Sequence, residues 1–345
     1  MKQTAATSLF REAQKRGASD VHVAAGSPVM LRIDGELRAE GSRNLTAAQA
    51  LSVVRSALSP ADFKRLQKDR EIDVSLPLPG GVRVRVNCHF TRGNVGLAAR
   101  LIPPAIPSLE ELGLRELAAL VFELRSGLVL VTGPTGAGKS TALASLIHAF
   151  NEREARSIVT LEDPVEFVFP KGKGIVRQRE YGQDFLSFPE ALKRVLRQDP
   201  DIVMVGEMRD PETVAAALTL AETGHLILAT LHTPDAVQTV DRIVDVFPPH
   251  QQAQVRSQLS LSLKMIIAQQ LLPGAKGGRI ALREVLVNTP AVAHTVRDGR
   301  AQELPSVMQT GEDAGMVTFA KAAKKLYKDG AITKEVFEAV TRPGR

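Results

Sequence analysis

Residues 133–140 read Gly-Pro-Thr-Gly-Ala-Gly-Lys-Ser and match the phosphate-loop (P-loop) pattern G-x-x-x-x-G-K-[ST] at every fixed position. An apolar run, Leu128–Thr132, precedes this segment, and a helical pattern follows from Thr141. Glycines in such a loop let backbone amides turn toward an anion, and the helix that follows adds its positive dipole end. We therefore expect a strand, a loop and a helix that bind nucleotide phosphates through Gly133, Pro134, Thr135, Gly136, Ala137, Gly138, Lys139, Ser140 and Thr141.

Two side chains of this loop have expected chemical roles. Lys139 should reach the β- and γ-phosphates, and the hydroxyl of Ser140 should bind Mg²⁺. The motif identifies a large class of nucleotide-binding proteins, and it does not by itself identify the reaction.

The chain around the loop predicts an α/β domain with a mostly parallel sheet. Apolar runs read as strands buried on both faces, and the longer segments between them read as helices. One predicted helix has Asp210 as its N-cap and ends at Gly224, and Thr233-Pro234-Asp235 predicts a second start of the same kind. The predicted strands are Leu128–Thr132, Ile158–Leu161, Asp201–Val205 and Leu226–Thr230, and a helical tail is expected to include His250–Leu272 and Thr333–Val340.

Residues 1–102 have a different pattern, which predicts a small α+β domain. Helical spacing covers Thr46–Leu58, and alternating runs at Ile72–Leu76 and Val82–Val86 flank a turn at residues 78–81, so they predict an antiparallel hairpin. Arg83 and Arg85 would then share the face opposite the valines. We expect a proline-rich linker at residues 103–111, in which Ser108 caps a helix, and the nucleotide-binding domain at 112–345.

Composition excludes several functions. The chain has 345 residues, a net charge of +6, no Trp and two Tyr, so we expect no stacking platform for nucleic acid. A single cysteine, Cys88, excludes an intrachain disulfide and a cysteine-rich zinc site. We find neither a signal-peptide pattern at the start nor an apolar run near 18 residues, which predicts a cytoplasmic protein.

Carboxylates follow two of the predicted strands. The run Ile202–Val205 leads to Glu207, which we expect on the Mg²⁺ side of the nucleotide, the alternative being a surface acid at a strand end. Glu162, Asp163 and Glu166 follow another strand and would repel one another unless a metal or hydrogen bonds occupied them. Both a water-activating base and a solvated turn remain open for this group.

Two histidines flank the last predicted strand. His232 lies at its carboxyl end, where ligands gather in parallel sheets, and it is the better functional candidate. His225 lies at the opposite end of the strand, so the same reasoning does not favour it as a functional residue.

These segments occur in the order found in secretion ATPases, and the chain is most similar to the PilT-type retraction ATPases among them. Gly224–Thr233 resembles the histidine box of that superfamily, and Thr160–Glu166 resembles its aspartate box. Gly17–His22, followed by Arg32-Ile33-Asp34-Gly35, resembles the start of a PAS-like N-terminal domain. The resemblance implies a RecA-like P-loop NTPase domain after a PAS-like domain, with ATP and Mg²⁺ as ligands.

The resemblance also implies residue roles. Glu166 would be the catalytic base, Glu207 the Walker B acid, and Glu162 with Asp163 would support the metal. His232 would sense the γ-phosphate. His225 and Arg297 would couple the site to its neighbours. Arg85 and Arg100 would reach the nucleotide phosphates.

Members of this family act as homohexameric rings, which implies a motor that hydrolyses ATP to disassemble pilin filaments in twitching motility. Its partners would be an inner-membrane pilus platform protein and, indirectly, the filament, at the cytoplasmic face of the membrane, with neither nucleic acid nor zinc. The apolar stripe Val255–Ile267 would serve subunit contact or core packing. A RecA-like nucleic-acid translocase and a non-catalytic scaffold are the alternatives from other classes.

Two features bear on the branch of the family. Assembly and secretion relatives usually carry a longer N-terminal region and a four-cysteine zinc insertion, so the single cysteine favours retraction. The retraction signature Ala-Ile-Arg-Asn-Leu-Ile-Arg-Glu appears here as Ala291–Asp298, in which Arg297 is kept and the first arginine is lost. An accessory PilU-like ATPase and an assembly or type II secretion ATPase therefore stand as alternatives.

Overall fold

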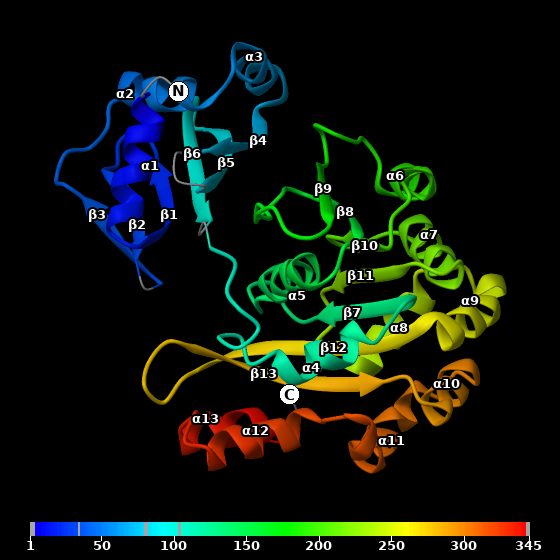
Figure 1. Cartoon of the computed structure of the whole chain (residues 1–345). Helices are drawn as coiled ribbons and strands as arrows, with labels where there is room; N and C mark the ends of the chain where they lie inside the picture. Colours follow the sequence, from blue (N-terminus) through cyan, green and yellow to red (C-terminus); the bar gives the residue numbers. More distant parts are fainter. Residues whose placement is uncertain (1–3, 34, 79–81, 103–104, 343–345) are drawn as a thin grey trace. The chain divides into compact units, whose positions relative to one another are not determined.

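The computed structural model describes residues 4–33, 35–78, 82–102 and 105–342, which form two compact units (Figure 1). The first unit runs to Ala105 and includes Pro164–Val168, and the second comprises Ile106–Asp163 and the chain from Phe169 onward. Some residues of the predicted linker, of the predicted hairpin turn and of the PAS-like segment lie outside the described residues: Pro103 and Pro104, Pro79 to Gly81, and Asp34.

The first unit is a six-stranded antiparallel sheet in the order β3-β2-β1-β6-β5-β4, with helices packed on it. Its elements are α1 (Ala5–Lys15), β1 (Ala18–Val23), β2 (Val29–Ile33), β3 (Glu36–Glu40), α2 (Ala47–Ala57), α3 (Pro60–Asp69), β4 (Glu71–Pro77), β5 (Arg83–Thr91) and β6 (Asn94–Ile102).

The predicted hairpin and helix of this unit are confirmed. β4 and β5 pair antiparallel, Val84 and Val86 are fully buried, and Arg85 between them is exposed. Thr46 caps α2 by accepting a hydrogen bond from the Gln49 amide. Burial, with a smaller effect of the Asp73 charge, raises the pKa of the Cys88 thiol to about 12, so this cysteine is protonated at neutral pH.

The second unit has a seven-stranded sheet in the order β13-β12-β7-β11-β10-β8-β9. All neighbours pair parallel except β13, which is antiparallel to β12. Its strands are β7 (Gly127–Thr132), β8 (Ser157–Glu162), β9 (Ile175–Glu180), β10 (Ile202–Val205), β11 (Leu226–Leu231), β12 (Leu263–Pro273) and β13 (Arg279–Val287). Its α-helices are α4 (Arg115–Phe122), α5 (Lys139–Arg153), α6 (Phe188–Val195), α7 (Pro211–Glu222), α8 (Ala236–Asp245), α9 (Pro249–Ser262), α10 (Pro290–Arg297), α11 (Leu304–Thr310), α12 (Phe319–Lys328) and α13 (Lys334–Thr341).

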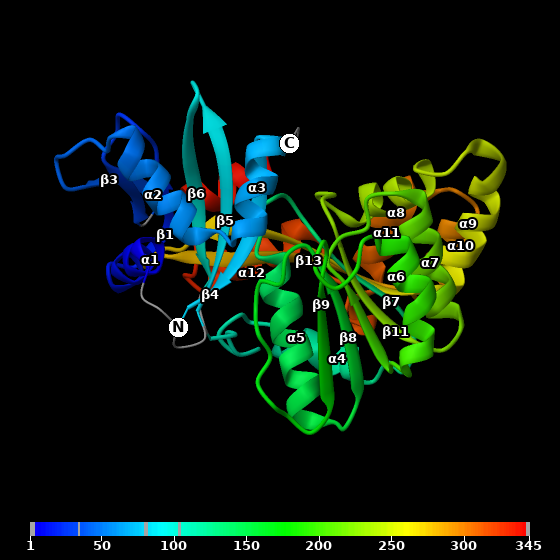
Figure 2. The same ribbon diagram turned by 90° about the horizontal axis from the view of Figure 1, so that it is seen from above.

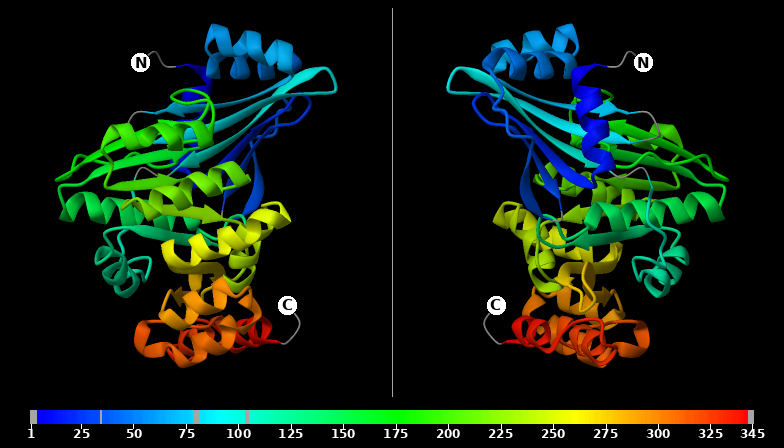
Figure 3. Two further views of the ribbon diagram at one scale, coloured as in Figure 1. Left: turned by 90° about the vertical axis from the view of Figure 1, so that its right-hand side faces the viewer. Right: turned by 90° about the vertical axis from the view of Figure 1, so that its left-hand side faces the viewer.

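Helices cover both faces of this sheet, which explains why the central strands β7, β10 and β11 are buried along their whole length. In β7, Leu128 and Leu130 pack into the core beneath α6, α7 and α8, whereas Val129 and Val131 pack beneath α4 and α5. Figure 2 shows α5 and α7 on opposite sides of the sheet. At one end, α12 and α13 pack on the β12–β13 hairpin (Figure 3). The four predicted parallel strands and the α/β class are confirmed.

The prediction of a helix over His250–Leu272 is wrong beyond residue 262. Helix α9 ends at Ser262 and the chain continues directly into β12, which inserts between β7 and β13. A short, continuous apolar run is compatible with either a buried helix or a buried strand, and no glycine or proline marks this junction. The stripe Val255–Ile267 is therefore a helix end and a buried strand, and its second half is core rather than a surface for subunit contact.

One predicted helix start is wrong, and a second lies two residues later than predicted. Ser108 and Glu111 form the reciprocal hydrogen bonds of a capping box, yet the chain makes only a turn, because Gly113 takes a left-handed φ of 60° and α4 begins at Arg115. For α8, Asp235 rather than Thr233 is the N-cap, and its side chain accepts from the Gln238 amide at 2.7 Å.

Within the described ranges, every helix is too short or too polar to cross a membrane.

The position of β12 gives a stability prediction. Ile266 is fully buried and lies between Leu130 of β7 and Leu286 of β13, so Ile266→Ala should lower the free energy of unfolding by about 2–5 kcal/mol. Leu261, near the end of α9, is 61% exposed, so Leu261→Ala should change the free energy of unfolding by less than about 0.5 kcal/mol. Urea denaturation followed by circular dichroism would measure both, and equal effects would contradict the central position of this strand.

Candidate active site

The P-loop connects β7 to α5 and has the backbone that its glycines permit. Gly133 has φ 141° and Gly138, the N-cap of α5, has φ 83°, conformations that side chains with a Cβ rarely adopt. A Cβ on Gly133 would lie 2.1 Å from the backbone oxygen of Gln269. Only glycine therefore fits where the loop leaves the sheet.

Lys139 folds back over the loop that precedes it. Its side chain is buried, and Nζ donates to the carbonyl oxygens of Gly133 at 2.7 Å and Pro134 at 3.1 Å. Nζ also lies 3.4 Å from Nδ1 of His232. The ammonium group is thus held directly above the loop, within reach of an anion that the loop amides would bind.

His232 connects this lysine to a carboxylate. Its Nε2 lies 3.2 Å from Oε1 of Glu207, and its Nδ1 also lies 3.4 Å from Oγ1 of Thr135. Because Lys139 can only donate, Nδ1 must be the acceptor, and Nε2 then carries the proton that points to Glu207. The three side chains meet because β7, β11 and β10 are neighbours and parallel, so their carboxyl ends lie at one edge.

Glu207 is an ionised carboxylate in this arrangement. Burial alone would raise its pKa, but hydrogen bonds from Arg209, at 2.7 Å, and from His232, together with the charge of Arg209, outweigh this effect. The pKa of Glu207 is therefore below its ordinary value, and the group stays charged at neutral pH.

The aspartate-box carboxylates are in different environments. Glu162, the last residue of β8, is buried and accepts hydrogen bonds from Thr160 Oγ1 at 2.6 Å and Gln178 Nε2 at 3.1 Å. Asp163, the next residue, is exposed. Hydrogen bonds thus stabilise the Glu162 carboxylate beside its acidic neighbours.

The oxygen ligands here fit Mg²⁺ held together with nucleotide. Ser140 lies in the first turn of α5, beside the loop, and the charged Glu207 follows β10. In the described part of the chain, no three His, Cys, Asp or Glu side chains form a ligand cluster. Mg²⁺ usually needs only one or two protein oxygens beside phosphates and water. This ligand set therefore suits Mg²⁺ bound together with nucleotide, and it does not suit a metal bound by protein side chains alone.

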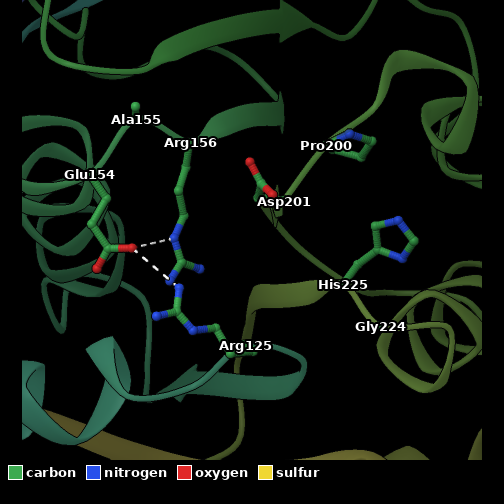
Figure 4. A pocket seen from close by; sticks show the side chains of 8 residues that line it. All are labelled: Arg125, Glu154, Ala155, Arg156, Pro200, Asp201, Gly224 and His225. Carbon is green, nitrogen blue, oxygen red and sulfur yellow. Dashed lines mark hydrogen bonds and ion pairs between the residues drawn. The ribbon is translucent and has the colours of Figure 1, made fainter.

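His225 is at the other end of β11, away from the P-loop. It borders a pocket of about 550 Å³ whose far wall carries Arg125 and Arg156, both directed at Glu154 (Figure 4). Its Nδ1 lies 3.2 Å from the carbonyl oxygen of Leu220. The structure therefore does not bring His225 to the nucleotide loop.

The remaining predicted residues lie elsewhere. Arg85 and Arg100 are direct cross-strand partners on β5 and β6 of the first unit, and Arg100 Nε contacts Asp20 Oδ1 at 2.9 Å. Glu166 lies in the segment Pro164–Val168, which groups with the first unit. Arg297 ends α10, where its Nε lies 3.5 Å from Ser260 Oγ of α9.

Sequence reasoning missed three polar partners. Arg209 pairs with Glu207. Its place in the sequence, two residues after Glu207, could have indicated this pairing. Gln178 of β9 reaches Glu162, and Gln269 of β12 contacts the P-loop. Neither strand was predicted, so nothing indicated that these side chains would meet the site.

Comparisons with known proteins agree with this geometry. The family model described as "Type II/IV secretion system protein" matches residues 2–338. The "Type IV pilus retractation ATPase PilT" of Pseudomonas aeruginosa is 43% identical over 329 residues, which cover 95% of this chain and 96% of that protein. The "Type IV pilus ATPase PilU" of the same organism is 40% identical over 328 residues, covering 95% of this chain and 86% of that protein. The crystal structure of the pilus retraction motor PilT with bound ADP superposes with a TM-score of 0.90 at 42% identity, covering 99% of this chain and 98% of that one.

The close packing at Gly133 predicts a difference between two glycines of the loop. Gly133→Ala would force a methyl group onto the Gln269 carbonyl, so we expect ADP to bind at least about tenfold more weakly. At Gly136 a Cβ would meet nothing within 4 Å, so Gly136→Ala adds only backbone strain and should weaken binding less. Fluorescence titration with a labelled ADP would measure both, and equal affinities would refute the packing argument.

Proposed function

Because this chain belongs to the type II/IV secretion system protein family, we propose that it is an ATPase motor that drives pilus retraction. The family, the α/β fold class and the enzyme class predicted from the sequence are confirmed by the match of the family model and by the similarity to PilT. The names of the close relatives also support the retraction function.

The observation that carries the proposal is the contact series from Lys139 through His232 to Glu207. A triphosphate in the loop would compete with the Gly133 and Pro134 carbonyls for the Lys139 ammonium. When Lys139 turns to phosphate, Nδ1 of His232 loses its donor and can respond to the γ-phosphate, which suits it as the sensor. The backbone amides of residues 133–141 would bind the phosphate oxygens.

Mg²⁺, when bound, would neutralise phosphate charge during phosphoryl transfer. Ser140 and Glu207 would hold it, with Glu162 and Asp163 as supporting carboxylates. The depressed pKa of Glu207 suits this role, because a ligand to Mg²⁺ must be ionised.

Three residues of the first unit would complete the catalytic set. We propose Glu166 as the base that orients or activates water, because general-base catalysis needs a carboxylate beyond the Mg²⁺ ligands. Arg85 and Arg100 stand opposite each other on neighbouring strands, an arrangement that costs energy unless an anion compensates it. Asp20 compensates Arg100, and nucleotide phosphate would compensate the pair further.

We further propose that the motor is a homohexameric ring with nucleotide clefts between rigid blocks, so that hydrolysis moves one block relative to the next. His225 and Arg297 would couple neighbouring parts. An inner-membrane platform protein would hold the ring at the cytoplasmic face and transmit its motion to the pilin filament.

A second candidate function is an accessory retraction ATPase. It is favoured by the changed segment Ala291–Asp298, most of which is α10, and by an identity to PilU close to that with PilT. Both candidates share the same hydrolytic chemistry and differ in whether the motor acts alone.

The role of Glu166 predicts separate effects on binding and turnover. Glu166→Gln should lower kcat for ATP hydrolysis at least about 100-fold, because the amide cannot accept a proton from water. The affinity for ATP should change by less than about threefold, since the P-loop is intact. Phosphate-release kinetics and nucleotide titration would measure the two quantities.

Lys139→Ala is the matched control, because it should weaken binding itself by removing the charge beside the phosphates. Normal turnover in Glu166→Gln would remove Glu166 as the base. A folded wild-type protein without ATPase activity would refute the proposed function.

The proposed arginines give a further prediction. Arg85→Ala and Arg100→Ala should each lower kcat by up to about 10³, as expected for arginines that stabilise charge on the transferred phosphoryl group. Arg38→Ala is the control, because Arg38 is exposed on β3 of the same unit and its side chain pairs with Glu36 at 3.2 Å. Steady-state ATPase assays would compare the variants. If Arg85→Ala and Arg100→Ala were as active as Arg38→Ala, the two arginines would have no catalytic role.

A further inference from the structure

Gln269 of β12 is a buried polar side chain that contacts the P-loop from beneath. It is 2% exposed, and the two ends of its amide have different partners. Nε2 donates to the carbonyl oxygen of Ala137, and Oε1 accepts from Nε of Arg283 at 2.7 Å. Gln269 therefore connects the loop to β13.

The chemistry of these partners permits only one orientation of the amide. The Ala137 carbonyl oxygen can only accept, and the Arg283 guanidinium can only donate. Turning the amide over would place two acceptors together at one end and two donors at the other. Arg283 thus fixes which end of Gln269 faces the loop.

The contact with Ala137 sets the direction of the next amide in the loop. In a trans peptide the carbonyl and the following N–H point in opposite directions. Because the Ala137 carbonyl points to Gln269, the N–H of Gly138 points away from β12, the direction in which loop amides must face to bind phosphate. Gly133 and Gly138 also pack closely on Gln269, since added Cβ atoms would lie 2.1 Å from its backbone oxygen and 3.0 Å from Nε2.

Arg283 is itself held in place. It stands opposite Gln269 in the β12–β13 register, and its Nη1 donates to the Gly113 carbonyl at 3.2 Å. Within the residues that the structure describes, no carboxylate lies at ion-pair distance from it. Burial lowers the pKa of Arg283 to about 10, so the group still carries its charge at neutral pH and remains a donor.

We propose that Gln269 and Arg283 form a positioning pair that holds the P-loop in its phosphate-binding conformation. Neither side chain is required to touch the nucleotide, because both act through the Ala137–Gly138 peptide. The inference rests on the proposed ATPase function, since it concerns the affinity of the same loop for nucleotide.

The test compares neighbouring glutamines of one strand. Gln269→Leu removes both hydrogen bonds, whereas Gln270→Leu changes a half-buried glutamine on the opposite face of β12. Gln269→Leu should raise the Kd for ADP and the KM for ATP about 3- to 30-fold, the loss expected for one or two buried hydrogen bonds. Its kcat at saturating ATP should fall less than about threefold, and Gln270→Leu should stay within about twofold of wild type in each quantity.

Two variants of Arg283 test the second member of the pair. Arg283→Met should raise the Kd for ADP, because the Gln269 amide is then free to turn, and Arg283→Lys should restore part of the affinity by supplying a donor. Thermal unfolding of each variant separates positioning from stability, since a purely structural role would lower Tm without raising Kd in the folded protein.

The outcomes are distinguishable. A folded wild-type protein that neither binds ADP nor hydrolyses ATP would refute the proposed function, whatever the variants do. Wild-type binding together with equal affinities of Gln269→Leu and Gln270→Leu would overturn the positioning pair. Should Gln269→Leu fail to fold, the Arg283 variants decide, and a wild-type Kd in folded Arg283→Met would overturn the proposal.

Discussion

The parallel pairing of β7, β11 and β10 is the constraint on which the candidate site depends. Each strand ends at the same edge of the sheet, and each is followed within two residues by a functional group: the P-loop, His232 and Glu207. Helices on both faces require these strands to be apolar throughout, so the polar groups collect beyond the strand ends. Fold and chemistry thus follow from one pattern, and a shift of one strand would separate the lysine, histidine and carboxylate.

This pattern explains how much could be predicted from the sequence. β7, β8, β10 and β11 were predictable because each is a short apolar run followed by a glycine or a polar group. The P-loop was predicted from its motif, and His232 and Glu207 were each predicted at a strand end, whereas their contact is known only from the structure. The helix α7 was equally clear, because Asp210, Pro211 and Gly224 mark both of its ends.

The limits of prediction also have physical causes. β12 follows α9 without a turn, so its apolar residues read as a continuation of the helix. That error hid Gln269, whose role depends on a strand pairing rather than on any local motif. Ser108 and Glu111 show the opposite case, because the local capping signal is real and forms, but Gly113 ends the turn before a helix develops.

Glu207 interacts with both His232 and Arg209, and His232 also contacts the P-loop lysine, Lys139. Arg209 and His232 both lower the pKa of Glu207, so the carboxylate has a second partner besides the histidine. Glu207 would therefore keep its contact with Arg209 if His232 moved when Lys139 turned to phosphate. Beneath the loop, Arg283 and Gln269 hold the backbone by contacts independent of Lys139. In the proposed function, a backbone cradle held by Gln269 and Arg283 would stay in place while the contacts of Lys139 and His232 rearranged around phosphate.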